Sequence, residues 1–370
     1  MKAFKTTFVS LFLLFSLNLC SQNSTHISPH DPLVQYSGRI DYSNPKEVSF
    51  SHPGTSFKMK FEGTICLILL ENRFKPGEGS DTTGNYYNII VDNNPPLVVA
   101  MTGYDHMYRI EGLEKGIHTV EVFKLTESLV GHGIFRGLEI EKGKKLLPIK
   151  QPERKIEFIG NSITCGYGNE GDSPNCHFSA KTENNYLAYG AITARNLNAA
   201  YMAVAYSGKG VIQNYSLEDK ETLPVIYDRI FPDKKESRWD FKKWQPDVVV
   251  INLGTNDFAH AAPDSALFVK TYLDFLKRIR WNYPKAHIFC IEGCMIKDGW
   301  PAGIPSLTLV KKFIESAVDN FKTDTDTKIE TFYLTTAKEG DFGCDYHPNK
   351  RKHQMMAGEL TSFIKLKTGW

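Results

Sequence analysis

A chain of 370 residues is long for a single hydrophobic core, so we expect two domains. Its contents of hydrophobic residues (41%) and charged residues (23%) are those of an ordinary globular protein. The 44 basic and 42 acidic residues leave a formal net charge of +2, which excludes a basic field strong enough to recruit nucleic acid.

The first twenty residues have the pattern of an export signal. Lys2 and Lys5 precede the apolar run 8–19, which is too short for a membrane span. The run ends at Cys20 in a context that resembles a bacterial lipobox, where the cysteine carries a lipid; ordinary cleavage is the alternative. We expect a signal peptide over 1–20 and a polar tether over 21–35. The protein would then reach the periplasm, the cell surface or the medium, with a lipid on Cys20 as its one membrane attachment.

Six further cysteines follow in the chain, at positions 66, 165, 176, 290, 294 and 344. In an exported protein they can be oxidised, and a disulfide such as Cys165–Cys176 would hold the loop between them. Buried free thiols are the alternative explanation. The Cys290-x-x-x-Cys294 spacing does not suit a zinc site, because no other cysteine or histidine clusters with it.

Residues 36–147 contain short apolar segments separated by turns. The predicted strands are 57–61, 64–70, 86–91, 97–101, 116–125 and 135–140. Strands at this spacing, without helical periodicity, predict a β-sandwich of the jelly-roll type. The charged, proline-containing segment 148–154 is the predicted linker.

Residues 155–370 alternate between buried strands and amphipathic helices. The predicted strands are 155–160, 199–205, 247–253, 286–292 and 329–334, and the predicted helices are 185–196, 265–281, 306–321 and 351–367. This alternation predicts an α/β domain with a five-stranded parallel sheet covered on both faces.

Four polar blocks follow strands of this domain or precede its last helix. They are GNSIT (160–164), SGKG (207–210), GTND (254–257) and DYHP (345–348). Each block alone has an ordinary structural explanation as a helix cap or a turn. The carboxyl ends of parallel strands meet at one edge of a sheet, so we expect the blocks to form one site.

The four blocks together resemble the SGNH (GDSL-like) hydrolase superfamily over residues 155–366. The resemblance implies a flavodoxin-like α/β/α fold, with Ser162 as nucleophile and His347 as base. It also implies an oxyanion hole made by Ser162, Gly208 and Asn256. This scheme needs no metal or other cofactor. Thr164 replaces the second glycine of G-x-S-x-G, which argues against the nucleophile elbow of α/β-hydrolases.

The spacing of the last block differs from the common Asp-x-x-His pattern of the superfamily, since Asp345 and His347 are two residues apart. With a β-sandwich in front, the chain resembles carbohydrate esterase family 2, whose members are two-domain acetyl esterases of plant-wall polysaccharides. The likeness extends to short motifs at 38–39, 61–64, 116–120, 124–127 and 181–186.

Asp345 is the expected partner of the catalytic histidine. In an extended loop, residues two apart project to one side with their Cα atoms ~6.5–7 Å apart, so the carboxylate would accept a hydrogen bond from His347 Nδ1–H. The alternative is that a main-chain carbonyl orients His347. Trp300, in a Gly/Pro-rich loop after the fourth strand of the α/β domain, is expected to stack on a sugar ring.

These expectations define an exported serine esterase that removes O-acetyl groups from plant-type polysaccharides or oligosaccharides through an acyl-enzyme on Ser162. We expect a monomer whose partner is the acetylated glycan, without nucleic acid. The alternatives are a carbohydrate-binding surface protein with a weak or inactive site, a lipase or thioesterase of the same superfamily, and acetyl transfer between sugars.

Overall fold

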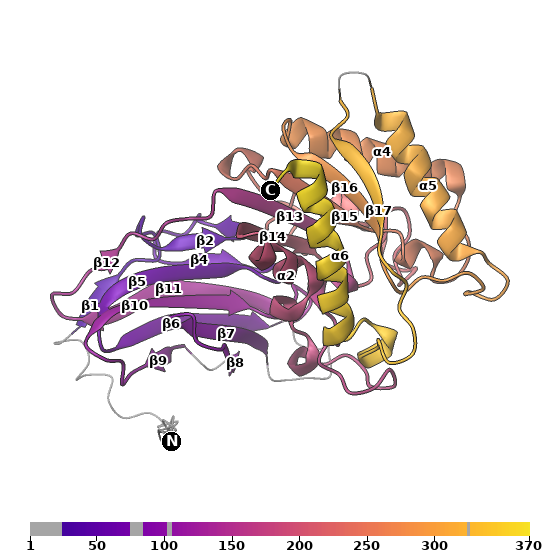
Figure 1. The fold of residues 1–370 in the computed structure, drawn as a ribbon. Coiled ribbons are helices and arrows are strands. Elements are labelled where there is room, and N and C mark those ends of the chain that lie inside the picture. The colour runs from indigo at the N-terminus through magenta and orange to yellow at the C-terminus, as the bar shows by residue number, and fades with distance from the viewer. Residues whose placement is uncertain (1–23, 75–83, 102–105, 324–325) are drawn as a thin grey trace.

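The computed structural model describes residues 24–74, 84–101, 106–323 and 326–370. The predicted signal peptide over 1–20, including Cys20, lies outside the described residues, so both expectations about it stay predictions. The described chain forms a β-sandwich followed by an α/β domain, as the colours from indigo to yellow show (Figure 1). This architecture confirms the predicted fold class.

Two antiparallel sheets make up the sandwich. The strands of the first sheet are β1 (Ser24–Ile27), β3 (Ile40–Asp41), β4 (Val48–Phe50), β6 (Cys66–Phe74), β9 (Tyr108–Ile110) and β11 (Gly131–Glu141). They are ordered β3-β4-β11-β6-β9, and β1 pairs with β11. The strands of the second sheet are β2 (Gln35–Ser37), β5 (Ser56–Gly63), β7 (Asn85–Val91), β8 (Leu97–Met101), β10 (Gly116–Lys124) and β12 (Leu146–Leu147). They are ordered β12-β5-β10-β7-β8, and β2 pairs with β5.

The sandwich core forms because alternate side chains of each strand point inward. In β5, for example, Phe57, Met59 and Phe61 are buried while the lysines between them are partly exposed. The structure corrects the predicted tether over 21–35, because residues 24–27 form β1 and pair with β11. The last strand of the sandwich ends at Leu147, and the first strand of the α/β domain begins at Arg154.

The α/β domain has a parallel sheet whose described strands are β13 (Arg154–Gly160), β14 (Ala199–Ala205), β15 (Val248–Asn252), β16 (His287–Glu292) and β17 (Ile329–Tyr333). Their order is β14-β13-β15-β16-β17, and each neighbouring pair is parallel. This is the flavodoxin-like order, as predicted. The α-helices are α1 (Ser162–Cys165), α2 (Tyr189–Asn196), α3 (Leu223–Ile226), α4 (Ser265–Asn282), α5 (Ser306–Phe321) and α6 (Lys350–Thr368).

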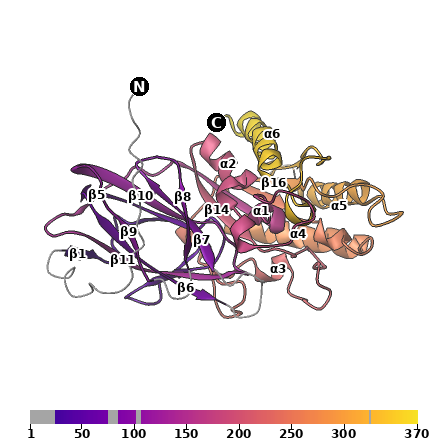
Figure 2. The same ribbon diagram turned by 90° about the horizontal axis from the view of Figure 1, so that it is seen from below.

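Helices cover both faces of the parallel sheet. Helices α2 and α6 pack on one face, and α4 and α5 pack on the other (Figures 1 and 2). The central strand β15 is buried at every position, which is why its sequence VVVIN is apolar without alternation until Asn252. Among the described residues, no helix has the length and apolar character needed to cross a membrane.

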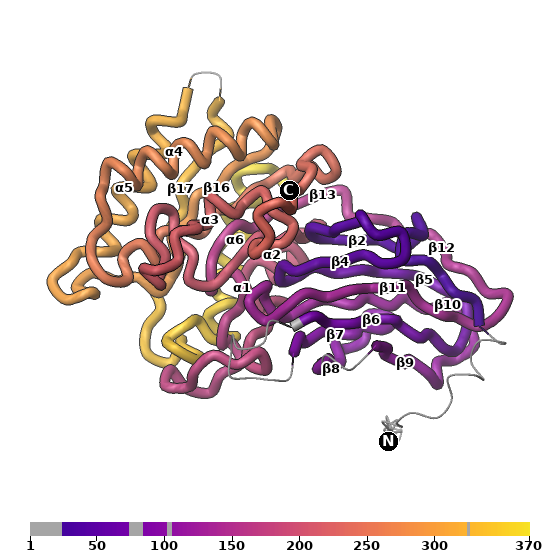
Figure 3. Tube along the Cα trace, turned by 180° about the vertical axis from the view of Figure 1, so that it is seen from behind, coloured from indigo at the N-terminus to yellow at the C-terminus, as the bar shows by residue number. Residues whose placement is uncertain are grey.

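The two domains share part of one hydrophobic core. Phe123, near the end of β10, packs edge-on against Tyr186 and stacks on Tyr201, with ring centroids 5.2 and 6.2 Å away. Arg39, between β2 and β3, donates a hydrogen bond of 3.1 Å to the carboxylate of Glu157 in β13, and both side chains are fully buried. Strands of the sandwich run toward the α/β domain (Figure 3), so their ends form this junction.

Candidate active site

Three of the four sequence blocks follow the carboxyl ends of adjacent strands. Ser162 comes two residues after β13, Gly208 follows β14, and Asn256 follows β15. Strands β14, β13 and β15 are neighbours in the sheet, so these residues lie along one edge. The fourth block reaches this edge from the loop before α6, because His347 contacts Ser162.

The central contact of the site is a hydrogen bond between His347 and Ser162. The Nε2 atom of His347 lies 2.7 Å from Ser162 Oγ, and the serine is only 8% exposed. Ser162 begins α1, so its N–H is one of those that a helix leaves without an intrahelical acceptor. Gly160 makes this tight strand-to-helix turn possible, because a Cβ atom there would lie 2.0 Å from Thr164 Oγ1.

The structure corrects the expected partner of His347. Its Nδ1 atom lies 3.1 Å from the main-chain carbonyl oxygen of Asp345, and the aspartate carboxylate makes other contacts. The expectation assumed an extended loop, but Asp345 and Tyr346 have φ values of 49° and 59°. This left-handed conformation turns the side chain of Asp345 away from the imidazole, and the alternative of a main-chain partner is the one observed.

The carboxylate of Asp345 instead organises the surroundings of the histidine. It accepts hydrogen bonds from Tyr167 Oη (2.7 Å) and from the N–H of Phe178 (3.1 Å), and it pairs with His177 Nδ1 (2.9 Å). The Tyr167 ring stacks on the His347 ring with centroids 4.1 Å apart. Asp345 thus acts on the histidine through its carbonyl and through Tyr167, a residue that sequence reasoning missed.

The buried position of His347 keeps its imidazole neutral. Burial lowers the pKa of His347 from 6.5 to about 4, although the carbonyl and the charge of Asp345 favour the protonated form. Burial alone would raise the pKa of Asp345, but hydrogen bonds from Tyr167 and His177 outweigh it, and the net shift is downward. A neutral imidazole beside a serine hydroxyl is the arrangement required of a general base.

Two further blocks bring amide donors to the same edge. Asn256 Nδ2 donates to the carbonyl of Lys209 over 2.9 Å, which fixes the orientation of the amide and leaves its second N–H for a ligand. Gly208 has a φ of 78°, a conformation that favours glycine, and its carbonyl accepts from Tyr215 N–H over 2.8 Å. The arrangement suits the stabilisation of an oxyanion next to Ser162.

The loop after Gly208 is folded around the carboxylate of Asp257. This carboxylate accepts hydrogen bonds from the N–H groups of Val211, Ile212 and Gln213, at 2.7 to 3.1 Å. Sequence reasoning gave Asp257 no role beyond a helix cap. Its place next to Asn256 in the GTND block was the available signal, because the strand-end rule puts both side chains near the loop after β14.

The disulfide of the structure joins Cys176 to Cys344, not Cys165 to Cys176. Cys165 is a buried free thiol, as are Cys66, Cys290 and Cys294. The bond ties the loop after α1 to the residue before Asp345, so it supports the segment that carries His347. The two half-cystines are 168 residues apart, and no local pattern in the sequence indicates such a pairing.

Trp300 lies in the loop after β16, at the carboxyl edge of the sheet, and its side chain is 50% exposed. This loop is tied back to α5, because the Asp298 carboxylate accepts from the N–H and hydroxyl of Thr308, at 2.9 and 2.6 Å. The indole is therefore available to a ligand at this edge, and its predicted role in sugar stacking stays a prediction.

One buried cluster in the described chain combines possible metal ligands. Ligand atoms of Glu127, Cys165 and Glu183 lie within 4.8 Å of one another. Both carboxylate oxygens of Glu127 already accept hydrogen bonds from Ser207, one from its N–H over 2.8 Å and one from its hydroxyl. The ammonium group of Lys124 lies beside them and donates to the carbonyl of Glu127 over 3.1 Å. These contacts account for the cluster as a hydrogen-bonded network.

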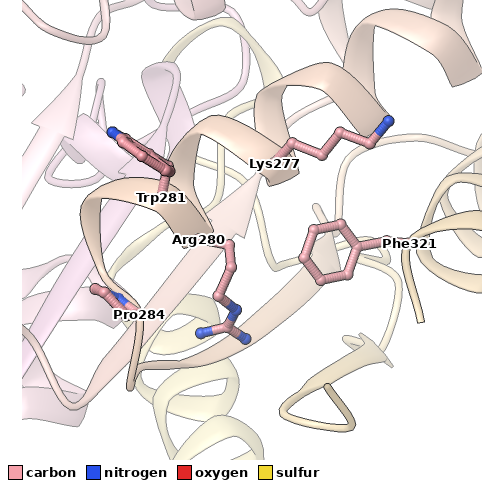
Figure 4. Close-up of a pocket in the computed structure, with 5 residues that line it drawn as sticks. All are labelled: Lys277, Arg280, Trp281, Pro284 and Phe321. Atoms are coloured by element: carbon pink, nitrogen blue, oxygen red, sulfur yellow. The ribbon is translucent and has the colours of Figure 1, made fainter. Parts of the chain in front are cut away.

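A surface hollow of about 540 Å³ lies far from the serine in the fold. Its lining residues are Lys277, Arg280, Trp281, Pro284 and Phe321. Figure 4 shows the side chain of Arg280 between Trp281 and Phe321 in this view. Arg280 donates to the carbonyls of Ala286 and Lys328, which precede β16 and β17, so the hollow is at the amino edge of the sheet. It is therefore not part of the Ser162 site.

Comparison with known proteins gives matches for both domains. Residues 36–149 match the family model of the carbohydrate esterase 2 N-terminal domain, and residues 158–355 match that of the GDSL-like lipase/acylhydrolase family.

Among curated proteins, the chain is 39% identical over 346 residues to the cellulase/esterase CelE of Acetivibrio thermocellus. The match covers 92% of this chain but only 40% of that protein. An acetylxylan esterase/glucomannan deacetylase of Cellvibrio japonicus is 27% identical over 356 residues, with 94% of this chain and 93% of that protein covered.

Among solved structures, a family two carbohydrate esterase from Clostridium thermocellum in complex with cellohexaose superposes with a TM-score of 0.81. It is 38% identical, and the match covers 91% of this chain and 99% of that one. The similarity therefore includes both domains and their junction.

Proposed function

Because the chain belongs to carbohydrate esterase family 2, we propose that it is an exported serine esterase that removes O-acetyl groups from plant-type polysaccharides or their oligosaccharides. The observation that carries the proposal is the 2.7 Å contact between His347 Nε2 and Ser162 Oγ, next to the amide donors of Gly208 and Asn256. A serine hydroxyl needs such a base, because its own pKa leaves almost no alkoxide at neutral pH.

In the acylation half of the reaction, His347 Nε2 takes the hydroxyl proton while Ser162 Oγ attacks the acetyl carbonyl carbon. The negative charge that develops on the carbonyl oxygen is stabilised by the N–H groups of Ser162 and Gly208 and by the side-chain amide of Asn256. His347 then returns the proton to the departing sugar hydroxyl, and the acetyl group stays on Ser162. The carbonyl of Asp345, bonded to Nδ1–H, fixes the tautomer that this transfer needs.

Deacylation uses the same groups with water in place of the sugar. His347 removes a proton from water, which attacks the acetyl carbonyl, and the oxyanion again meets the three donors. Acetate leaves when Ser162 Oγ regains the proton. Acetyl transfer to a second sugar would follow the same steps with a sugar hydroxyl as acceptor.

Acetylated xylan and glucomannan are the substrates we propose, with the half-exposed Trp300 as a stacking surface for a sugar ring. Support for this class comes from the relatives, one of which is an acetylxylan esterase/glucomannan deacetylase and another of which binds cellohexaose. We further propose that the protein acts as a monomer outside the cytoplasm, with residues 1–20 as its export signal and Cys20 as its lipid attachment point.

The test compares hydrolysis of nitrophenyl acetate and nitrophenyl octanoate by the wild type and by Ser162→Ala. We expect the wild type to prefer the acetyl ester and Ser162→Ala to lose nearly all activity. Equal activity of the two proteins would refute Ser162 as nucleophile, and a preference for octanoate would favour a lipase or thioesterase. Release of acetate from acetylated xylan, mannan and pectin then identifies the polysaccharide.

A carbohydrate-binding surface protein without activity is the second candidate. The disposition of Ser162, His347 and Asn256 argues against it, because such a protein needs no neutral imidazole on a buried serine. Binding of an acetylated glycan without release of acetate would favour it. Carbohydrate pull-down and acetate measurement on the same samples distinguish the two.

A further inference from the structure

Two short motifs of the sequence, Lys124–Glu127 and 181–186, have no part in the mechanism above, yet they meet in the interior. Lys124, Glu127 and Glu183 are almost completely buried, with exposed fractions of 0, 0 and 1%. Lys124 ends β10 of the sandwich, and Glu127 follows it, whereas Glu183 belongs to the α/β domain. Burying three ionisable groups is costly unless each is paired, so we asked what their contacts hold in place.

Glu127 grips a single residue of the catalytic loop with both of its carboxylate oxygens. Oε2 accepts a hydrogen bond of 2.8 Å from the N–H of Ser207, and Oε1 accepts one from the Ser207 hydroxyl. Ser207 directly precedes Gly208, so its carbonyl and the N–H of Gly208 share one peptide plane. The carboxylate from the sandwich therefore restrains the plane that carries a donor of the oxyanion hole.

The other side of this plane is held from within the α/β domain. The Gly208 carbonyl accepts from Tyr215 N–H over 2.8 Å, and the Lys209 carbonyl accepts from Asn256 Nδ2 over 2.9 Å. Gly208 has no side chain and a φ of 78°, so its peptide planes rotate easily unless both sides are restrained. Glu127 supplies the restraint on the side of Ser207.

Glu127 is itself fixed by the rest of the network. Its N–H donates to the Glu183 carboxylate over 2.9 Å, and its carbonyl accepts from the Lys124 ammonium over 3.1 Å. Burial raises the pKa of both glutamates and lowers that of Lys124, and the opposite charges offset part of each shift. A carboxylate with its main chain held on both sides is a rigid anchor.

We propose that Glu127 is a positioning residue for the oxyanion hole, by which the β-sandwich completes the active site of the α/β domain. The role rests on the proposed esterase function. Glu127 touches neither the substrate nor the reacting atoms. It aligns the N–H of Gly208 through Ser207, so its removal weakens the transition state more than the binding of substrate.

The experiment compares Glu127→Ala and Glu127→Gln with wild type. We expect Glu127→Ala to lower kcat on the order of 10²-fold with KM nearly unchanged, as for the loss of one oxyanion donor. Glu127→Gln keeps an acceptor for the N–H of Ser207, and its amide can donate to the hydroxyl, so we expect it to recover most of the rate. Each variant is also assayed for its rate of labelling at Ser162 by a fluorophosphonate, which needs the nucleophile and the oxyanion hole but no acetyl group.

The matched control is Glu157→Gln, which changes an equally buried glutamate of the domain junction without a contact to the catalytic loop. We expect this variant to lose thermal stability but to keep kcat and the labelling rate. If Glu127→Ala lost no more activity than Glu157→Gln at equal folded fraction, Glu127 would be merely structural and the proposal would be overturned.

Should Glu127→Ala fail to fold, Glu127→Gln and Ser207→Ala decide the question. Ser207→Ala removes only the hydroxyl bond, so it should slow labelling by less than tenfold but measurably. Wild-type labelling rates in both variants would overturn the proposal. Fast labelling of a wild-type protein that releases no acetate would overturn the acetyl esterase function alone, because the labelling rates would still decide the role of Glu127.

Discussion

Replacing Asp345 by asparagine separates the observed geometry from a catalytic triad. In a serine hydrolase whose aspartate carboxylate holds the base, the change to asparagine lowers kcat by roughly 10⁴-fold, or about 5.5 kcal/mol of transition-state stabilisation. Here His347 Nδ1 is bonded to the main-chain carbonyl of Asp345, which the substitution leaves in place. Asparagine also tolerates the left-handed conformation with φ of 49° at this position.

The expected loss follows from the contacts of the carboxylate. In Asp345→Asn, the side-chain amide oxygen can still accept from Tyr167 or Phe178, while the pairing with His177 is lost. The His177 side chain is 90% exposed, so solvent screens that pair and it adds little stability. We expect kcat to fall by less than about tenfold and stability by about 1 kcal/mol, the net value of one hydrogen bond.

The assay is steady-state hydrolysis of nitrophenyl acetate at neutral pH, with melting temperatures measured on the same preparations. Asp345→Ala is the comparison, because alanine loses every side-chain bond and fits the left-handed region poorly; we expect a larger loss of both activity and stability. A drop of about 10³-fold or more for Asp345→Asn at unchanged melting temperature would contradict the reasoning, since it would mean that the carboxylate itself serves the histidine during turnover.

Three further predictions concern the base, the oxyanion hole and the domain junction. Because burial lowers the pKa of His347 to about 4, the neutral base persists in acid, and kcat/KM for acetate release should stay level from pH 7 to about 5 and fall with a midpoint near 4; a midpoint near 6.5 would contradict this. Asn256→Ala should lower kcat by roughly 10²–10³-fold at little change in KM, and Asn256→Asp, with no N–H on its carboxylate, should restore nothing. Arg39→Met leaves Glu157 buried without its partner and should cost about 3–5 kcal/mol in urea unfolding, whereas Arg39→Met combined with Glu157→Met should recover much of that loss; equal stability of the two proteins would refute an energetic coupling.

The parts of the fold with strong periodicity were predictable from the sequence. The helix predicted over 306–321 is α5, and the strand predicted over 199–205 is β14, because buried parallel strands and amphipathic helices have distinct patterns. Short sandwich strands such as β1 and β9 were missed. Three or four residues carry too little alternation to identify a strand, and their pairing depends on partners far along the chain.

The candidate site was predictable where chemistry follows strand ends. Ser162 and Asn256 follow adjacent strands, and their residue types carry the chemical signal. The carboxylate of Asp345 was misplaced because its direction depends on a backbone conformation that residue spacing does not encode. Glu127 escaped notice because its partner Ser207 lies 80 residues away in another domain.

The shared core at the junction bears on how such enzymes can be divided or recombined. Phe123 of the sandwich lies against Tyr186 and Tyr201, so an isolated α/β domain would expose aromatic surface that is now dry. The boundary between the two domains is thus continuous in packing although it is clear in the chain. Exchanging the sandwich for that of a relative would transplant one half of an interior. Chimeras should therefore carry both domains from one parent, and divergence on one side of the junction should require compensating change on the other.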